Sequence, residues 1–186
     1  AFEATGHDHV MALRTMRPID PAATNFVTMG RFSGEKNHAM LLRAMVRLIK
    51  TQPNTHLYIL GEGPLLDQTR ALRDAMGLAD HVTLPGFSSR ALQLMRQCDC
   101  FVLPSLYEGQ PMVILEALTL DKPVIVTDIA GSRSALAGGY GHIVEGKVGD
   151  KSFAAAMEAF CKGMLTFKTF DAEAYNADVV ADFHAL

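Results

Sequence analysis

The chain has 186 residues, of which 49% are hydrophobic and 20% are charged, and its formal net charge is −3. A chain of this length and composition suits one globular domain with a core of its own. The slightly acidic balance argues against nucleic-acid binding, because domains that bind nucleic acids usually carry a basic patch. No run of residues approaches the ~20 apolar positions that span a bilayer.

Residues 1–24 lack a sustained hydrophobic period, so we expect a linker or arm there, with a short extended piece around Val10 to Leu13. His7 and His9 flank Asp8 in this segment. Histidines in a polar terminus are more often solvated than bound to a metal, and we expect no metal site. The N-terminus shows no signal-peptide pattern. The chain starts at Ala1 without an initiator methionine, and we expect a piece excised from a longer protein.

From residue 25 onward, short apolar runs alternate with amphipathic segments. The pattern predicts strands at 25–30, 56–60, 82–84, 99–103, 124–127 and 142–144. It predicts helices at 37–50, 65–76, 89–97, 111–120 and 152–165, a helical turn at 131–134, and a last helix from residue 170 with Tyr175, Val179 and Phe183 on one stripe. Strands that are apolar on both faces indicate a parallel sheet covered by helices on both sides.

We therefore predict a Rossmann-like, three-layer α/β sandwich with a six-stranded parallel sheet. Its divisions are an arm (1–24), the sheet domain (25–169) and a C-terminal helix or tail (170–186). The three cysteines, Cys98, Cys100 and Cys161, fit neither a disulfide framework nor a zinc knuckle. We expect buried structural thiols and a reducing, cytoplasmic setting.

Ligands of open α/β sheets bind outside the carboxyl ends of the strands, and the glycine-rich and charged loops of this chain follow strands. Arg31 and Lys36 follow the first strand. A guanidinium and an ammonium together suit a diphosphate. Surface pairing of these two cations with Glu35 or Glu62 explains them equally well.

The second strand is followed by Gly61-Glu62-Gly63, which resembles the opening of a dinucleotide-binding fingerprint but lacks its third glycine. Pro64 would begin the next helix at its first position. Most such loops are tight turns. An NAD-binding domain is disfavoured, because no ribose-binding acid is evident at the end of the second strand.

The stretch 105–117, SLYEGQPMVILEA, follows the fourth strand and carries Glu108 and Glu116. A helix that begins inside it would direct the free N–H groups of Met112 and Val113 toward the ligand edge, which makes an anion site. Glutamates beside such a site suit sugar hydroxyls better than phosphate. The alternative is that Glu116 caps the helix and Glu108 forms a surface salt bridge.

Several motifs occur in a familiar order: GRFSGEK, LYILGEGP, VTLPGF, VLPS, YEGQPMVILEA, KPVIVTD and GGYGHIVE. Residues 30–148, roughly two-thirds of the chain, resemble through them the C-terminal, donor-binding half of a retaining GT-B glycosyltransferase of the family 4 (group 1) type. Two glutamates separated by seven residues are that family's signature, and Glu108 and Glu116 match it.

The resemblance implies catalytic roles for three residues. Arg31 and Lys36 would bind the donor diphosphate and stabilise the leaving nucleotide, and Glu108 would contact the transferred sugar. Glu116 would bind the ribose hydroxyls. The remaining contacts implied are backbone groups at Gly109, Met112 and Val113 for the phosphates, and Phe87 and Ser88 beside the base. The donor that the resemblance implies is a nucleotide-diphosphate sugar, and it implies neither a metal nor a further cofactor.

The resemblance also implies hexosyl transfer to a cell-envelope or other glycan acceptor and a missing N-terminal acceptor domain of the same protein. It implies peripheral association of the full-length enzyme with the inner face of the membrane. We expect the present chain alone to bind nucleotide sugars weakly and to be inactive. Gln110-Pro111-Met112 replaces the Phe-Gly-Leu of many relatives, which leaves the donor sugar open. The alternative is a non-catalytic nucleotide-binding or interaction module with the same fold.

Overall fold

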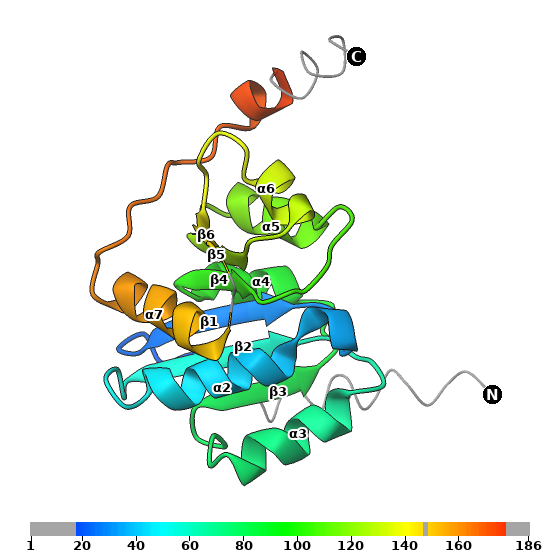
Figure 1. Cartoon of the computed structure of the whole chain (residues 1–186), viewed down its shortest axis with the longest axis vertical. Coiled ribbons are helices and arrows are strands. Elements are labelled where there is room, and N and C mark those ends of the chain that lie inside the picture. The colour runs from blue at the N-terminus through cyan, green and yellow to red at the C-terminus, as the bar shows by residue number, and fades with distance from the viewer. Residues whose placement is uncertain (1–17, 147–148, 178–186) are drawn as a thin grey trace, which may run out of the picture.

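The computed structural model describes residues 18–146 and 149–177 (Figure 1). Its six strands form one sheet in the order β3-β2-β1-β4-β5-β6, and every neighbouring pair is parallel. The strands are β1 (Thr24–Met29), β2 (Thr55–Leu60), β3 (Val82–Gly86), β4 (Cys100–Leu103), β5 (Val124–Thr127) and β6 (His142–Val144). The predicted six-stranded parallel sheet is confirmed.

Helices cover both faces of this sheet. They are the 3-10 helix η1 (Gly34–Lys36), α2 (His38–Leu48), α3 (Leu66–Ala75), α4 (Ala91–Gln97), α5 (Met112–Thr119), α6 (Ala130–Ala135) and α7 (Asp150–Cys161). Two core clusters show the layering: α2, α3 and α7 contribute to one cluster, and α4, α5 and α6 to the other. Figure 1 shows α2, α3 and α7 on the near side of the sheet. The predicted three-layer sandwich is confirmed.

The strands are apolar on both faces because both faces are covered. On β1, Phe26 belongs to the cluster that contains Leu41 of α2, whereas its neighbour Val27 belongs to the cluster that contains Ile114 of α5. Successive strand residues point to opposite faces of a sheet. A run without polar alternation therefore fills both cores at once.

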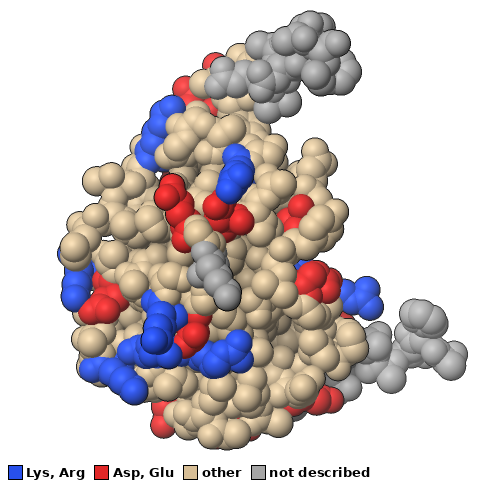
Figure 2. Space-filling model, in the orientation of Figure 1, with Lys and Arg blue, Asp and Glu red and all other residues tan. Residues whose placement is uncertain are grey.

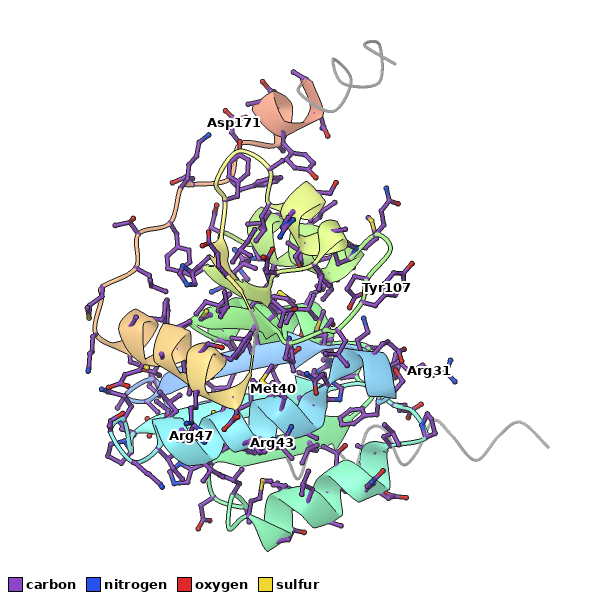
Figure 3. The ribbon with its side chains drawn as sticks, in the orientation of Figure 1. Arg31, Met40, Arg43, Arg47, Tyr107 and Asp171 are labelled. Carbon is purple, nitrogen blue, oxygen red and sulfur yellow. The ribbon has the colours of Figure 1, made fainter. Side chains whose placement is uncertain are left out.

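Helix α2 separates an apolar face from a basic one. Met45 and Leu48 are buried, whereas Arg43 and Arg47 are exposed and point away from the sheet (Figure 3). Figure 2 shows basic side chains gathered over this helix. Arg47 forms an ion pair with Asp150 of α7. Such partly exposed pairs contribute little to stability, and a solvated helix face accounts for these charges.

The prediction of a helix over 152–165 is wrong at both ends. Helix α7 begins at Asp150 and ends at Cys161. Gly163 adopts φ +64°, and the Met164 N–H donates back to the Ala159 carbonyl at 2.9 Å. This pattern closes a helix at a left-handed glycine. The apolar pattern continues past that point, which is why periodicity alone placed the end too late.

The start of the tail packs on the sheet domain. The rings of Phe170 and Tyr175 lie 5.1 and 6.2 Å from the ring of Tyr140, between centroids, and residues 172–177 are helical. The tail therefore covers an apolar surface of this domain. Val179 and Phe183, the other two members of the predicted stripe, lie outside the described residues.

The end of the predicted arm also contacts the domain. Ile19 packs against the core cluster of α4 and α5, and the Asn54 side-chain amide donates to the Ala22 carbonyl at 2.7 Å. Thr24 is already part of β1. The predicted extended piece at Val10 to Leu13 and the His7-Asp8-His9 segment lie outside the described residues.

Two further properties concern thiols and membranes. Cys98 and Cys100 are buried, as expected, and Cys161 is half-buried; all three are free.

Within the part of the chain that the structure describes, no helix is long and apolar enough to cross a bilayer.

Candidate functional site

The candidate site lies where β1 and β4 adjoin, the point at which the strand order reverses. Ligands of open α/β sheets bind at this switch point, outside the carboxyl ends of the strands. The loops that follow β1 and β4 meet there, since the Leu106 N–H donates to the Glu35 carbonyl at 2.8 Å. Figure 3 shows Arg31 and Tyr107, one from each loop, at this same edge of the sheet.

Lys36 and Glu108 are in direct contact. The Lys36 Nζ lies 2.5 Å from the Glu108 Oε1, and the two side chains are 16% and 11% exposed. The pairing of Lys36 with Glu35 or Glu62 is therefore wrong. The alternative of a salt bridge for Glu108 holds, but this pair is largely buried rather than on the surface.

Arg31 lies apart from this pair. Its side chain is exposed and points away from the body of the molecule (Figure 3), and it forms no ion pair within the described residues. Glu35, also exposed, accepts a hydrogen bond from the Ser33 hydroxyl at 2.5 Å, and chiefly this bond lowers the pKa of Glu35. The two cations of the first loop thus occupy different surroundings.

Ser105 and Thr127 support Glu108 from the sheet. The Ser105 Oγ donates to the Glu108 Oε1 at 2.6 Å, and the Thr127 Oγ1 donates to the Ser105 carbonyl at 2.5 Å. Ser105 is 0% exposed. Sequence reasoning missed both residues. A serine at the end of a strand, three positions before a glutamate, was the available signal.

Two glycines make room for the pair. A Cβ on Gly30 would lie 3.2 Å from the Lys36 Cε, so the missing side chain leaves space for the lysine stem. A Cβ on Gly131 of α6 would lie 2.6 Å from the Glu108 carbonyl oxygen and 3.1 Å from that of Gly109. Helix α6 therefore packs directly against the backbone of the Glu108 loop.

The Gly-Glu-Gly loop after β2 holds the first loop in place. The Phe32 N–H donates to the Glu62 carbonyl at 2.8 Å, and Gly61 and Gly63 take φ values of +135° and +151°. These contacts agree with the tight-turn interpretation. The expectation that Pro64 begins the next helix is wrong, because α3 starts at Leu66 after a turn.

Helix α5 begins at Met112, directly after Pro111. The Met112 N–H donates to the Gln110 carbonyl at 2.9 Å, so the expectation of a free donor is wrong for Met112. The Val113 N–H reaches no backbone carbonyl of the described chain. Glu116 is exposed one turn further along the helix and does not cap it.

The other predicted residues fall into two groups. Arg31, Phe87 and Ser88 line one hollow of about 370 Å³ at the ends of β1, β2 and β3. Gly109 and Met112 line a smaller pocket, which Tyr175 from the tail also lines. The structure thus brings Lys36 together with Glu108, and Arg31 together with Phe87 and Ser88.

His38 is a buried neighbour that the sequence did not single out. It begins α2, and its ring lies 4.5 Å from the ring of Phe32. Burial, with a smaller contribution from the Lys36 charge, lowers the pKa of His38 to about 4. Its imidazole is therefore neutral near pH 7. Over residues 18–146 and 149–177, no group of three His, Cys, Asp or Glu side chains is arranged to hold a metal ion.

A family model described as "Glycosyl transferases group 1" matches residues 15–176. The chain belongs to this family. The group 1 membership expected from the motifs is thereby confirmed. Among curated relatives, this group 1 chain is 36% identical over 112 residues to an uncharacterized glycosyltransferase, MJ1059, of Methanocaldococcus jannaschii, covering 60% of the chain and 28% of that protein.

A second relative is the N-acetylgalactosamine-N,N'-diacetylbacillosaminyl-diphospho-undecaprenol 4-alpha-N-acetylgalactosaminyltransferase of Campylobacter jejuni. It is 36% identical over 121 residues, or 64% of this chain and 32% of that protein. The chain thus spans about a third of the length of these relatives. Among solved structures, a mutant of S. aureus TarM superposes with a TM-score of 0.71 at 19% identity, over 80% of this chain and 30% of the TarM chain. This likeness confirms the Rossmann-like fold.

Proposed function

We propose that this group 1 chain is the nucleotide-sugar-binding half of a retaining glycosyltransferase that transfers a hexosyl group to a cell-envelope or other glycan acceptor. The observation that carries the proposal is the Lys36–Glu108 pair at the β1–β4 switch point. A nucleotide-diphosphate sugar has a diphosphate on one side of its scissile bond and a sugar on the other. The cation suits the diphosphate and the carboxylate suits the sugar.

In this proposal Lys36 offsets the negative charge that grows on the departing diphosphate, which is a large contribution in a partly desolvated site. Arg31 reaches the same diphosphate from the neighbouring hollow. The Val113 N–H adds a donor at the start of α5. No metal is needed, because side-chain cations and a helix terminus take that role.

Glu108 accepts hydrogen bonds from the transferred sugar, and Glu116 from the ribose. Phe87, a residue that is 52% exposed, would place its ring beside the base at the edge of the hollow that Ser88 also lines. All of these residues follow strands of one sheet. A single extended ligand across the carboxyl edge would meet them in turn.

The relatives support the substrate class. An Escherichia coli relative is named as a UDP-Gal:alpha-D-GlcNAc-diphosphoundecaprenol alpha-1,3-galactosyltransferase, and the C. jejuni relative is named for a lipid-linked acceptor. TarM and pneumococcal GtfA were solved with UDP. We propose that the full-length protein adds an N-terminal acceptor domain and works at the inner face of the membrane.

Isothermal titration of the chain with UDP-, GDP- and CDP-linked hexoses tests donor binding. We expect weak binding of one nucleotide class, a loss of it in Lys36→Ala and Arg31→Ala, and no change in Lys151→Ala, an exposed lysine on α7. No binding of any donor at millimolar concentration would exclude the donor site. In the full-length protein, Glu108→Ala should abolish transfer. Transfer that survives this change would favour a non-catalytic nucleotide-binding module.

A further inference from the structure

Two donors reach the same oxygen of Glu108. The Lys36 Nζ and the Ser105 Oγ lie 2.5 and 2.6 Å from Oε1. The other oxygen, Oε2, receives no hydrogen bond from any described residue. A carboxylate has about four acceptor positions, so the protein holds Oε1 while Oε2 keeps its capacity to accept hydrogen bonds.

Ser105 is itself held firmly. It lies two residues after the end of β4 and is 0% exposed, and its carbonyl accepts a hydrogen bond from the Thr127 hydroxyl at 2.5 Å. Thr127 is the last residue of β5. The backbone of Ser105 is thus held by the end of β5, and its short side chain presents the hydroxyl to Glu108.

A third element limits the backbone of Glu108. Gly131 of α6 leaves no room for a Cβ, since that atom would lie 2.6 Å from the Glu108 carbonyl oxygen. The loop therefore cannot move toward α6. Glu108 is restrained through its side chain by Ser105 and through its backbone by α6.

We propose that Ser105 is a positioning residue of the transfer reaction, which fixes Glu108 Oε1 so that Oε2 faces the donor sugar. This inference rests on the proposed function and deepens it. Lys36 alone does not suffice for this task, because the lysine has to serve the diphosphate of the same donor. Ser105 contacts neither the diphosphate nor the sugar and keeps the carboxylate in place while Lys36 exchanges partners.

The expected effect follows from the strength of the bond. Hydrogen bonds to a charged group contribute more than neutral ones, and catalytic groups must stay within about 0.5 Å of their working position. In the full-length protein, Ser105→Ala should lower kcat by about ten- to a hundredfold. The KM for the nucleotide sugar should change by less than about threefold, because the diphosphate contacts remain.

Ser132→Ala is the matched control. Ser132 is also 0% exposed and lies on α6, and its hydroxyl has no hydrogen-bond partner within the described structure. Its removal should leave both kcat and KM unchanged. An equal loss of kcat in both variants would mean that any buried serine matters equally, and it would overturn the proposal.

A double-mutant cycle separates positioning from a contribution to stability. If Ser105 acts through Glu108, then Ser105→Ala should cost nothing further in a Glu108→Gln background. Fully additive losses would overturn the inference. Initial rates of nucleotide release, with the donor that the wild-type protein turns over, provide the measurement.

A ligand-free readout keeps this inference distinct from the proposed function. Crystal structures of the Ser105→Ala and Ser132→Ala variants should show the Glu108 carboxylate displaced from its position in the first and unmoved in the second. An unmoved carboxylate in Ser105→Ala overturns the positioning role, whatever the activity. A wild-type protein that turns over no nucleotide sugar overturns the proposed function and leaves the crystallographic result to decide the role of Ser105.

Discussion

Gly61 lies against the Gly30 carbonyl so closely that a Cβ on Gly61 would come within 1.9 Å of that oxygen. The contact joins the loops that follow β1 and β2, and Arg31 comes directly after it. The backbone of Gly61 also has φ +135°, a value that side chains of L-residues rarely adopt. Position and conformation thus both require glycine.

Gly61→Ala should lower the free energy of unfolding by about 3 kcal/mol or more, because the backbone has to move away from Gly30 and to leave its left-handed conformation. Urea unfolding measures the change. Gly34→Ala is the control, since Gly34 is exposed and a Cβ there would meet nothing within 4 Å. Its effect should stay below about 1 kcal/mol. Equal stability of the two variants would contradict the packing argument.

The Lys36–Glu108 pair should show strong energetic coupling. A double-mutant cycle with Lys36→Met and Glu108→Gln should give about 1–3 kcal/mol in urea unfolding, since either change alone leaves a poorly solvated charge behind. The same cycle on the more exposed pair, with Arg47→Met and Asp150→Asn, should give less than about 1 kcal/mol. Coupling that is equal in the two cycles would argue against the burial of the Lys36–Glu108 pair.

His38 should make stability depend on pH. Its pKa is about 4 in the folded chain, against about 6.5 when unfolded, so the unfolded state binds more protons between these values. Stability is therefore highest above pH 6.5 and should fall by up to about 3 kcal/mol as the pH drops toward 4. Urea unfolding across this range should show a shallower slope for His38→Phe. An unchanged slope in His38→Phe would contradict the prediction.

The buried thiols should resist alkylation. Burial raises the pKa of Cys98 to about 12 and that of Cys100 well above its usual value, and the thiolate is the reactive form. In a Cys161→Ser variant at pH 8, mass spectrometry should find almost no iodoacetamide adduct on the native protein and two adducts after unfolding in urea. Rapid labelling of the native variant would show that these strands open readily.

Much of the fold could be predicted from the sequence, because strands that are buried on both faces have no polar alternation. The bounds of β5 and β6 agree with the predicted ranges. The end of α7 could not be predicted from periodicity, since a left-handed glycine rather than a polar residue ends it. The prediction that Pro64 begins a helix was wrong because a turn precedes α3, which starts at Leu66.

The site was predictable in part. Strand order alone places loops at one edge, so Lys36 and Glu108 could be assigned to the same side. Their contact could not be predicted, because it depends on β1 and β4 being neighbours. Ser105 was missed because a single buried serine in the loop after β4 gives no periodic signal. The Met112 N–H was misassigned because its local bond to Gln110 has no sequence signal.

Because β1 and β4 are neighbours in the sheet, the candidate site forms only when β4 pairs with β1 during folding. Lys36 and Glu108 are 72 residues apart, and chains emerge from the ribosome N-terminal part first. Strands β1, β2 and β3 can pair before β4 is made, which leaves β1 as an open edge able to bind other strands. The arrival of β4 closes that edge and completes the ion pair in one event. The Lys36–Glu108 pair therefore forms only in molecules in which β4 has already covered the open edge of β1.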